Sequence, residues 1–501
     1  MSFFSTRGGA CVTASQSILW GLAHDGGLYV PSMFPQITRE RLSAFQEMTY
    51  QERAARVLRS FLEDYSIAEI EASVNAAYTG FDDPAIAPVK ELDNNTYVME
   101  LFHGPTLAFK DMALKLLPHL ITLAAEKNGE SREISIVTAT SGDTGKAALE
   151  GFKDVAGTSC TVLYPYGGIS RVQELQMTTT GGVNTHVIGV EGTFDEAQTC
   201  VKKLFTNDEF RQKMDAMGKL PASANSINFG RLATQVVYYF SAYSDMVSSG
   251  AVRMGQTVNF VVPTGNFGNI LAAYYAKQMG LPIGKLICAS NRNNVLSDFF
   301  HDGIYYTHRS FFKTRSCSMD ILISSNLERL LYELVDRDAK LVKTWMELQE
   351  SCGSFSIGAQ RLSELRKTFW GGYADDIMTT SEIHRVYERK GYLMDPHTAV
   401  ASHVLEEYRQ KMNDHSPAVI VATASPYKFS ETVLEAILGA SQTEGLDAFA
   451  CADKLQEITR VPMPKQIETL GTLPIRHQTV CKMGMVEPTL LSEWRNAKKD
   501  A

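Results

Sequence analysis

Several features are scarce in this 501-residue chain, and each absence narrows the class of protein. The eight cysteines are scattered without a C-x-x-C pair, which predicts reduced thiols in a cytoplasmic protein. The eleven histidines show no H-E-x-x-H or comparable spacing, so no metal site is predicted. No apolar run approaches the roughly 20 residues of a membrane span, and the start MSFFSTRGGA does not resemble a signal peptide. The net charge of −8, without a basic cluster, argues against a nucleic-acid partner.

The patterns that are present predict an α/β protein. The composition, with 44% hydrophobic and 21% charged residues, is ordinary for a globular protein, and the length predicts two or three domains. Apolar, strand-like runs alternate with helix-like runs from about residue 131, and a capping box at Thr193 and Glu196 starts one such helix. Strands apolar on both faces and alternating with helices are typical of parallel sheets. The expected strands cover residues 133–140, 158–165, 184–190, 257–264, 285–290 and 417–425.

The loops after these strands carry the functional information, because ligands bind beyond the carboxyl ends of parallel strands. ATSGDTGKAAL (139–149) places small hydroxyl residues before a helix, which suits an anion. It is not a nucleotide-binding Walker loop, because Thr140 replaces its first glycine and Ala147 its magnesium-binding hydroxyl. PTGNFGNI (263–270) suits a phosphate, although its glycines are equally consistent with an ordinary turn.

Two further segments contribute a hydroxyl and an amine. In ATASPYKF (422–429), Thr423 or Ser425 is expected either to face a ligand or to cap the next helix. HGPTLAFKD (103–111) concentrates turn residues before Lys110, which taken alone reads as a solvated helix start. An amine, two anion loops and a hydroxyl together are what pyridoxal 5′-phosphate chemistry requires.

These motifs, in this order, resemble those of the threonine synthase family of fold-type II pyridoxal-phosphate enzymes. ANSINFGR (224–231), the N-terminal ST-R-G (5–8) and DGGLYVP (25–31) add to a resemblance that extends to about residue 430. Tyr166 departs from the family, which often has a basic residue there, and residues 431–501 show no match. The resemblance implies two parallel-sheet α/β domains of the tryptophan synthase beta kind with an N-terminal cap. The expected domains are 1–85 (cap), 86–130 with 221–501 (large, cofactor-binding) and 131–220 (small, inserted).

The resemblance also implies an activity, the conversion of O-phospho-L-homoserine and water to L-threonine and phosphate. Lys110 would hold the cofactor and move protons as a neutral amine, and Thr423 would contact the ring nitrogen. Asp143 would lie near the phenolic oxygen of the cofactor, either sharing a proton or turned away. The remaining predicted ligands are Gly265, Asn266, Phe267, Gly268 and Asn269 for the cofactor phosphate, Ser141 and Thr144 for the substrate carboxylate, and Ser226, Asn228 and Arg231 for the substrate phosphate.

Three alternatives stay open from the sequence. Residues 226–231 are also consistent with a plain helix start followed by a surface arginine. A phospho-lyase that releases 2-oxobutyrate and ammonia would carry the same motifs. A catalytically silent binding protein on the same scaffold is the third possibility, and the sequence does not reveal the oligomeric state.

Overall fold

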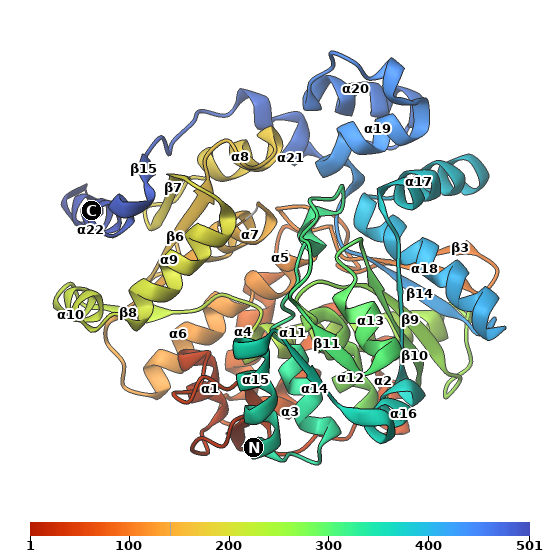
Figure 1. Cartoon of the computed structure of the whole chain (residues 1–501), viewed down its shortest axis with the longest axis horizontal. Coiled ribbons are helices and arrows are strands. Elements are labelled where there is room, and N and C mark those ends of the chain that lie inside the picture. The colour runs from red at the N-terminus through yellow and green to blue at the C-terminus, as the bar shows by residue number, and fades with distance from the viewer. Residues whose placement is uncertain (141, 501) are drawn as a thin grey trace.

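Two β-sheets covered by helices form the molecule, of which the computed structural model describes residues 1–140 and 142–500 (Figure 1). The larger sheet has the strand order β13-β10-β9-β14-β4-β3, parallel except for the antiparallel pair β3 and β4. The smaller sheet has the order β15-β7-β6-β5-β8 and is parallel throughout. The parallel α/β class predicted from the sequence is therefore confirmed.

The strand bounds follow the apolar runs of the sequence. The larger sheet contains β3 (Val89–Asp93), β4 (Thr96–Glu100), β9 (Val258–Pro263), β10 (Ile283–Ser290), β13 (Phe369–Tyr373) and β14 (Ala418–Ala422). The smaller sheet contains β5 (Glu133–Ala139), β6 (Thr158–Pro165), β7 (Thr185–Glu191), β8 (Lys219–Ala222) and β15 (Val480–Lys482). The short antiparallel pairs are β1 (Phe3–Ser5) with β2 (Tyr29–Pro31) and β11 (Ile304–Tyr306) with β12 (Ser354–Ser356).

Helices fill the connections between the strands. Those preceding the smaller sheet are α1 (Ala14–Trp20), α2 (Arg39–Ala44), α3 (Tyr50–Phe61), α4 (Ile67–Ala77), α5 (Lys110–Leu114) and α6 (Leu117–Lys127). The middle of the chain contains α7 (Asp143–Phe152), α8 (Arg171–Thr178), α9 (Phe194–Thr206), α10 (Asp208–Ala216), α11 (Phe229–Ser248), α12 (Gly268–Gln278) and α13 (Val295–Asp302). The remaining helices are α14 (Leu327–Leu334), α15 (Ala339–Cys352), α16 (Gly358–Thr368), α17 (Asp376–Lys390), α18 (Pro396–Met412), α19 (Ser430–Leu438), α20 (Ala448–Thr459), α21 (Lys465–Glu468) and α22 (Val486–Asp500).

Both faces of the larger sheet are buried, which explains its continuous apolar strands. Along β14, Val419 and Val421 point into one hydrophobic core, whereas Ile420 points into the other. Helix α18 packs across β9, β10 and β14 on one of these faces. In the smaller unit, the predicted capping box at the start of α9 is present, with Thr193 and Glu196 bonded to each other's backbone amides.

The C-terminal segment requires a correction to the predicted domains. Strand β15 pairs with β7, and Leu490 and Trp494 of α22 pack against Leu163 in the core of the smaller sheet. Figure 1 shows this end of the chain beside β7, away from α19 and α20. Residues 480–500 therefore do not belong with the larger sheet; a three-residue strand gives too weak a sequence pattern to reveal such a long-range pairing. We propose the division 1–85, 86–130 with 223–479, and 131–222 with 480–500.

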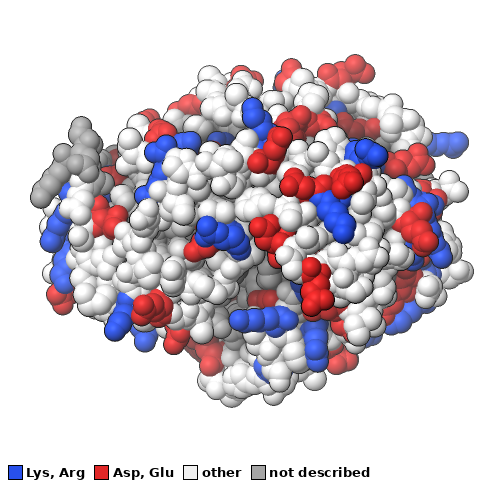
Figure 2. All heavy atoms as spheres, turned by 90° about the horizontal axis from the view of Figure 1, so that it is seen from above, with Lys and Arg blue, Asp and Glu red and all other residues white. Residues whose placement is uncertain are grey.

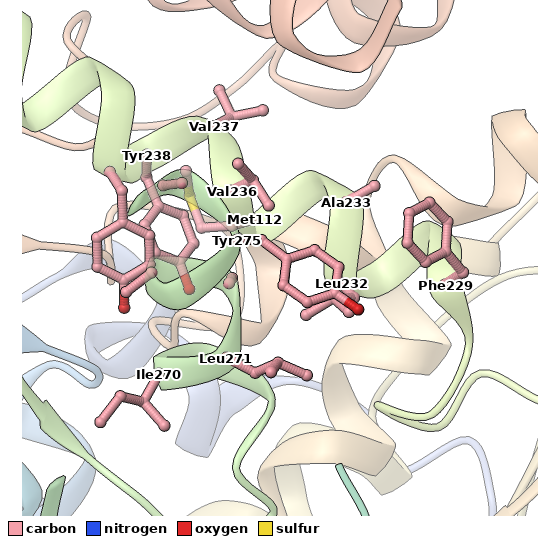
Figure 3. Close-up of a cluster of buried hydrophobic side chains, with 14 of the residues drawn as sticks. Met112, Phe229, Leu232, Ala233, Val236, Val237, Tyr238, Ile270, Leu271 and Tyr275 are labelled. Atoms are coloured by element: carbon pink, nitrogen blue, oxygen red, sulfur yellow. The ribbon is translucent and has the colours of Figure 1, made fainter. Parts of the chain in front are cut away.

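One hydrophobic cluster holds together the helices that carry predicted site residues (Figure 3). Met112 of α5, Leu232 of α11 and Leu271 of α12 meet in it, and all are fully buried. Because protein cores are close-packed, this cluster fixes the relative positions of the first turns of the three helices.

On the face seen in Figure 2, acidic and basic side chains are intermixed and form no large patch of one charge sign. Within the described part of the chain, no helix has the length and apolarity to cross a membrane.

Candidate active site

A cavity of about 750 Å³ opens between the two sheets, at the carboxyl ends of their strands. Its wall includes residues that directly follow β5, β9 and β14, together with Lys110 at the start of α5. This is the place that the topology of parallel sheets predicts for a ligand.

The turn before Lys110 is held by the acid that follows it. The Asp111 carboxylate accepts hydrogen bonds from the Thr106 amide (2.8 Å) and the Thr106 hydroxyl (2.6 Å). A Cβ at Gly104 would lie 2.5 Å from this carboxylate, so glycine is required there. Lys110 is thus placed on the cavity wall by a turn closed through Asp111, and it is not a solvated helix start.

Lys110 lies among charged groups in a largely dry environment. Its Nζ is 3.5 Å from Asp143 Oδ2, and its side chain is 12% exposed. Burial lowers the pKa of Lys110 below its ordinary value; Asp143 opposes this, whereas Lys428 and Arg231 add repulsion. A lysine in such a setting is easily deprotonated to the nucleophilic amine.

Asp143 is buried and paired with neighbouring side chains. Lys428 Nζ lies 2.8 Å from Asp143 Oδ1, and Ser318 donates to Asp143 Oδ2 at 3.0 Å. Burial alone would raise the pKa of Asp143, but Lys428, Lys110 and His397 hold it well below its usual range. The carboxylate is therefore held ionised by these cations, and whether it shares a proton with the phenolic oxygen of the cofactor or turns away from it stays a prediction.

The 263–270 loop lines the cavity and contains a buried donor without a partner among the described residues. Phe267 has a left-handed backbone (φ 67°), and α12 begins without a side-chain cap. Asn269 Oδ1 accepts hydrogen bonds from the hydroxyls of Tyr238 (2.5 Å) and Tyr239 (2.6 Å), which turns its Nδ2 the other way. That Nδ2 is buried without a partner among the described residues. Helix-start amides and an unpaired amide donor suit a phosphate.

The two hydroxyls of the 422–429 loop have separate positions. Ser425 accepts from the Tyr427 amide and caps the 3₁₀ turn η3 (Pro426–Phe429). Thr423 lies on the cavity wall, and its carbonyl accepts from the Phe109 amide at 2.8 Å. The backbone of Thr423 is therefore bonded one residue before Lys110, and its hydroxyl is left for a ligand.

The 139–149 loop offers a second helix start. Thr144 lies on the cavity wall, and α7 begins after Gly142 (φ 136°) without a side-chain cap. A Cβ at Gly142 would come within 2.4 Å of Gln173, so this turn requires glycine. Ser141, also predicted to bind the carboxylate, lies outside the described residues.

Arg231 is buried on the cavity wall and is not a surface residue. Its Nη1 donates to the Ala224 carbonyl (3.0 Å), its Nε has no partner, and no ion pair to it occurs in the described chain. Burial lowers the pKa of Arg231 to about 10, which leaves it charged at neutral pH. A buried cation without a carboxylate partner suits an anionic ligand.

Of the two predicted ligands that precede Arg231 in the sequence, one lies on the cavity wall and the other is buried behind it. Ser226 lies on the wall, where its Oγ accepts from Asn326 Nδ2 (3.2 Å). Asn228 is fully buried; it accepts from the Gly230 amide (2.9 Å) and donates to the Ile18 carbonyl (2.9 Å). The structure gives Asn228 a helix-capping role behind the cavity wall, and its role as a ligand stays a prediction.

The structure adds site residues that sequence reasoning missed. Lys428 and His397 line the cavity, as do Lys313 and Ser318 from the 311–321 segment. His397 Nδ1 lies 2.6 Å from Asp395, and its Nε2 accepts from the Ser318 amide (3.1 Å). These residues come from segments that the predicted motifs do not cover, except Lys428, whose position in ATASPYKF was visible in the sequence.

The donors around the cavity fit pyridoxal phosphate. A buried amine, an uncapped helix with an orphaned amide donor, and a hydroxyl beside the amine match the aldehyde, phosphate and ring nitrogen of that cofactor. The pyridoxal-phosphate-dependent enzyme family model covers residues 84–424, so fold and site define an enzyme of this class.

Further comparisons identify the family within the class. Models of the threonine synthase N terminus and C-terminal region match residues 2–78 and 398–486. Threonine synthase from Pseudomonas aeruginosa is 40% identical over 444 residues, 88% of this chain and 91% of that protein. The crystal structure of pyridoxal-phosphate-bound threonine synthase from Brucella melitensis covers 99% of both chains, with a TM-score of 0.88 and 38% identity.

The chain belongs to the threonine synthase family. Human threonine synthase-like 1 is 39% identical over 84% of this chain, which spans 58% of that longer protein.

Proposed function

We propose that this enzyme converts O-phospho-L-homoserine and water to L-threonine and phosphate with pyridoxal 5′-phosphate. The observation that carries the proposal is the buried Arg231 on the same cavity wall as Lys110, for which the described residues provide no ion-pair partner. It supplies a site for a phosphate group of the substrate in addition to the uncapped α12, which would take the cofactor phosphate.

Each group of residues has a proposed role. The cofactor, when bound, supplies an electron sink for negative charge on the substrate carbons. Lys110 would tether it and move protons at Cα and Cβ, and Thr423 would donate to the ring nitrogen. The remaining proposed ligands are Gly265, Asn266, Phe267, Gly268 and Asn269 for the cofactor phosphate, Ser141 and Thr144 for the substrate carboxylate, and Ser226 and Arg231 for the substrate phosphate.

The cysteines bear on the compartment in which the protein works. Eight free cysteines, three of them buried without a disulfide, support a reducing, cytoplasmic setting. A small phosphorylated amino acid is the proposed partner, and neither nucleic acid nor membrane is proposed as one.

One incubation separates this function from its alternatives. The purified holoenzyme is given O-phospho-L-homoserine, and phosphate, threonine and 2-oxobutyrate are assayed together. We expect one threonine per phosphate released. Stoichiometric 2-oxobutyrate would instead identify the phospho-lyase, and no product with no visible cofactor absorption would indicate a silent binding protein.

The tethering role of Lys110 has a direct test. Borohydride reduction followed by peptide mapping should place the cofactor adduct on Lys110, and Lys110→Ala should abolish turnover and the adduct. An adduct on Lys115 or Lys146 would contradict the assignment.

A further inference from the structure

A second lysine, Lys428, is completely buried beside the proposed cofactor lysine. It comes from η3 and reaches Asp143 Oδ1 at 2.8 Å, and its Nζ also donates to the Thr106 carbonyl at 2.9 Å. Burying an ammonium group is costly unless it is paired and hydrogen-bonded, so the chain maintains this position through specific contacts.

Asp143 lies between the two lysines. Its Oδ1 faces Lys428, and its Oδ2 lies 3.5 Å from Lys110 Nζ. One carboxylate thus serves two ammonium groups, and neither lysine has it alone. The contact to the Thr106 carbonyl fixes Lys428 to the same turn that delivers Lys110.

The charged groups around Lys110, Asp143 and Lys428 come from several elements. Lys110 faces Asp143 of α7, Lys428 of η3, Arg231 of α11 and the Cys317 thiol. Asp143 also faces His397 at the start of α18. Burial lowers the pKa of Lys110, Asp143 works against this, and the cations Lys428 and Arg231 work with it.

We propose that Lys428 is a positioning residue that shares Asp143 with Lys110 and so keeps the Lys110 amine available in its neutral form. The inference rests on the proposed role of Lys110 as the cofactor lysine. Without Lys428, Asp143 would pair with Lys110 alone and hold it as an ammonium ion, which neither attacks a carbonyl nor accepts a proton.

The test measures the protonation of Lys110 without turnover. An amine-reactive reagent is applied to the full-length chain freed of cofactor across a range of pH, and labelling of Lys110 is quantified by mass spectrometry. Lys428→Met should raise the midpoint by about one pH unit, which makes labelling at neutral pH about tenfold slower. Lys146→Met is the matched control, because Lys146 bonds to Glu150 (3.0 Å) and to the Thr180 hydroxyl (3.0 Å) rather than to Asp143. The control should leave the midpoint unchanged.

The double variant Asp143→Asn/Lys428→Met removes both charges and keeps the test decisive if the single variant does not fold. We expect it to fold and to return the midpoint of Lys110 to the wild-type value or below. An unchanged midpoint in folded Lys428→Met, or a raised midpoint in the double variant, would overturn the proposal. Failure of both variants to fold would also overturn it, because Lys428 would then act through the Thr106 carbonyl alone.

A second readout uses the holoenzyme. The pH midpoint of the visible absorption of the lysine-bound cofactor should move upward in Lys428→Met, and kcat should fall more than KM rises. If borohydride mapping on the wild type placed the cofactor on another lysine, the proposed role of Lys110 in the reaction would be contradicted. The labelling experiment would still report whether Lys428 controls Lys110.

Discussion

Two tyrosine hydroxyls determine which end of the Asn269 amide faces the cavity. Both donate to Oδ1, so the Nδ2 donor is directed away from them and remains free for a ligand. The tyrosines are buried in the cluster between α11 and α12 and lie outside the cavity wall. They would therefore affect cofactor binding only through Asn269.

Tyr239→Phe should weaken cofactor binding about 2- to 10-fold, because one hydrogen bond contributes about 0.5–1.5 kcal/mol. The measurement is a titration of the cofactor-free protein with pyridoxal phosphate, followed by fluorescence. Tyr243→Phe is the control on the same helix, since its hydroxyl bonds to the Gln256 carbonyl (3.1 Å). Equal losses of affinity in the two variants would show that Asn269 is not the link.

At the level of single residues, the sequence identified candidate site residues better than the side chains that contact them. The turn residues before Lys110 alone indicated a solvated helix start, and Lys110 was assigned only from the whole set of motifs. The glycines of 263–270 indicated close backbone approach. The role of Asp143 could not be resolved, because its state depends on Lys428, which lies 285 positions away by the numbering. The capping role of Asn228 was not visible in the sequence, because a helix cap and a ligand use the same side-chain oxygen and amide.

Among the elements, the turn from 103 to 111 depends on a single glycine, Gly104. Gly104→Ala would place a methyl group 2.5 Å from the Asp111 carboxylate, and the turn would have to shift. We expect a loss of about 1–3 kcal/mol in the free energy of unfolding, typical of overpacking. Cofactor content should fall as well, because the shift displaces Lys110.

Chemical denaturation and the visible absorption of the holoenzyme measure these two effects. Gly484→Ala is a suitable control, since a Cβ there would meet nothing within 4 Å. A Gly104→Ala variant with normal stability and full cofactor content would show that the turn can relax without moving Lys110.

Strands and helices were predictable where the hydrophobic pattern is long. Strand β6 matches the predicted 158–165 segment, and β9 and β14 lie within the predicted runs. Strand β15 was not predictable, because its three residues carry no periodicity and its partner β7 is remote in the sequence. The length of the hydrophobic pattern, rather than the position of a strand in the chain, determines whether the sequence predicts that strand.

For the whole molecule, His103 makes stability depend on pH. Its Nδ1 lies 2.5 Å from Asp82 and its Nε2 2.9 Å from Glu100. Burial would lower the pKa of His103, but the two carboxylates raise it to about 9. Because the folded-state value lies above the unfolded one of about 6.5, the stabilisation is complete below pH 6.5 and is lost as pH rises through 9.

His103→Gln should flatten this dependence. We expect the wild type to lose about 1–2 kcal/mol of unfolding free energy from this group between pH 6.5 and 9.5, after allowing for solvent screening. Urea unfolding at several pH values measures the difference between the two proteins. Parallel curves for variant and wild type would show that other groups govern the alkaline loss.

The pairing of residues 480–500 with the smaller sheet also affects folding during synthesis. Strands β5 to β8 are synthesised well before the edge strand β15 of their sheet and before the Leu490 and Trp494 side chains. Until then, the nascent sheet exposes an unpaired β7 edge and an uncovered apolar face, both of which favour aggregation. We therefore expect the small domain to be most prone to aggregation before residues 480–500 have joined it.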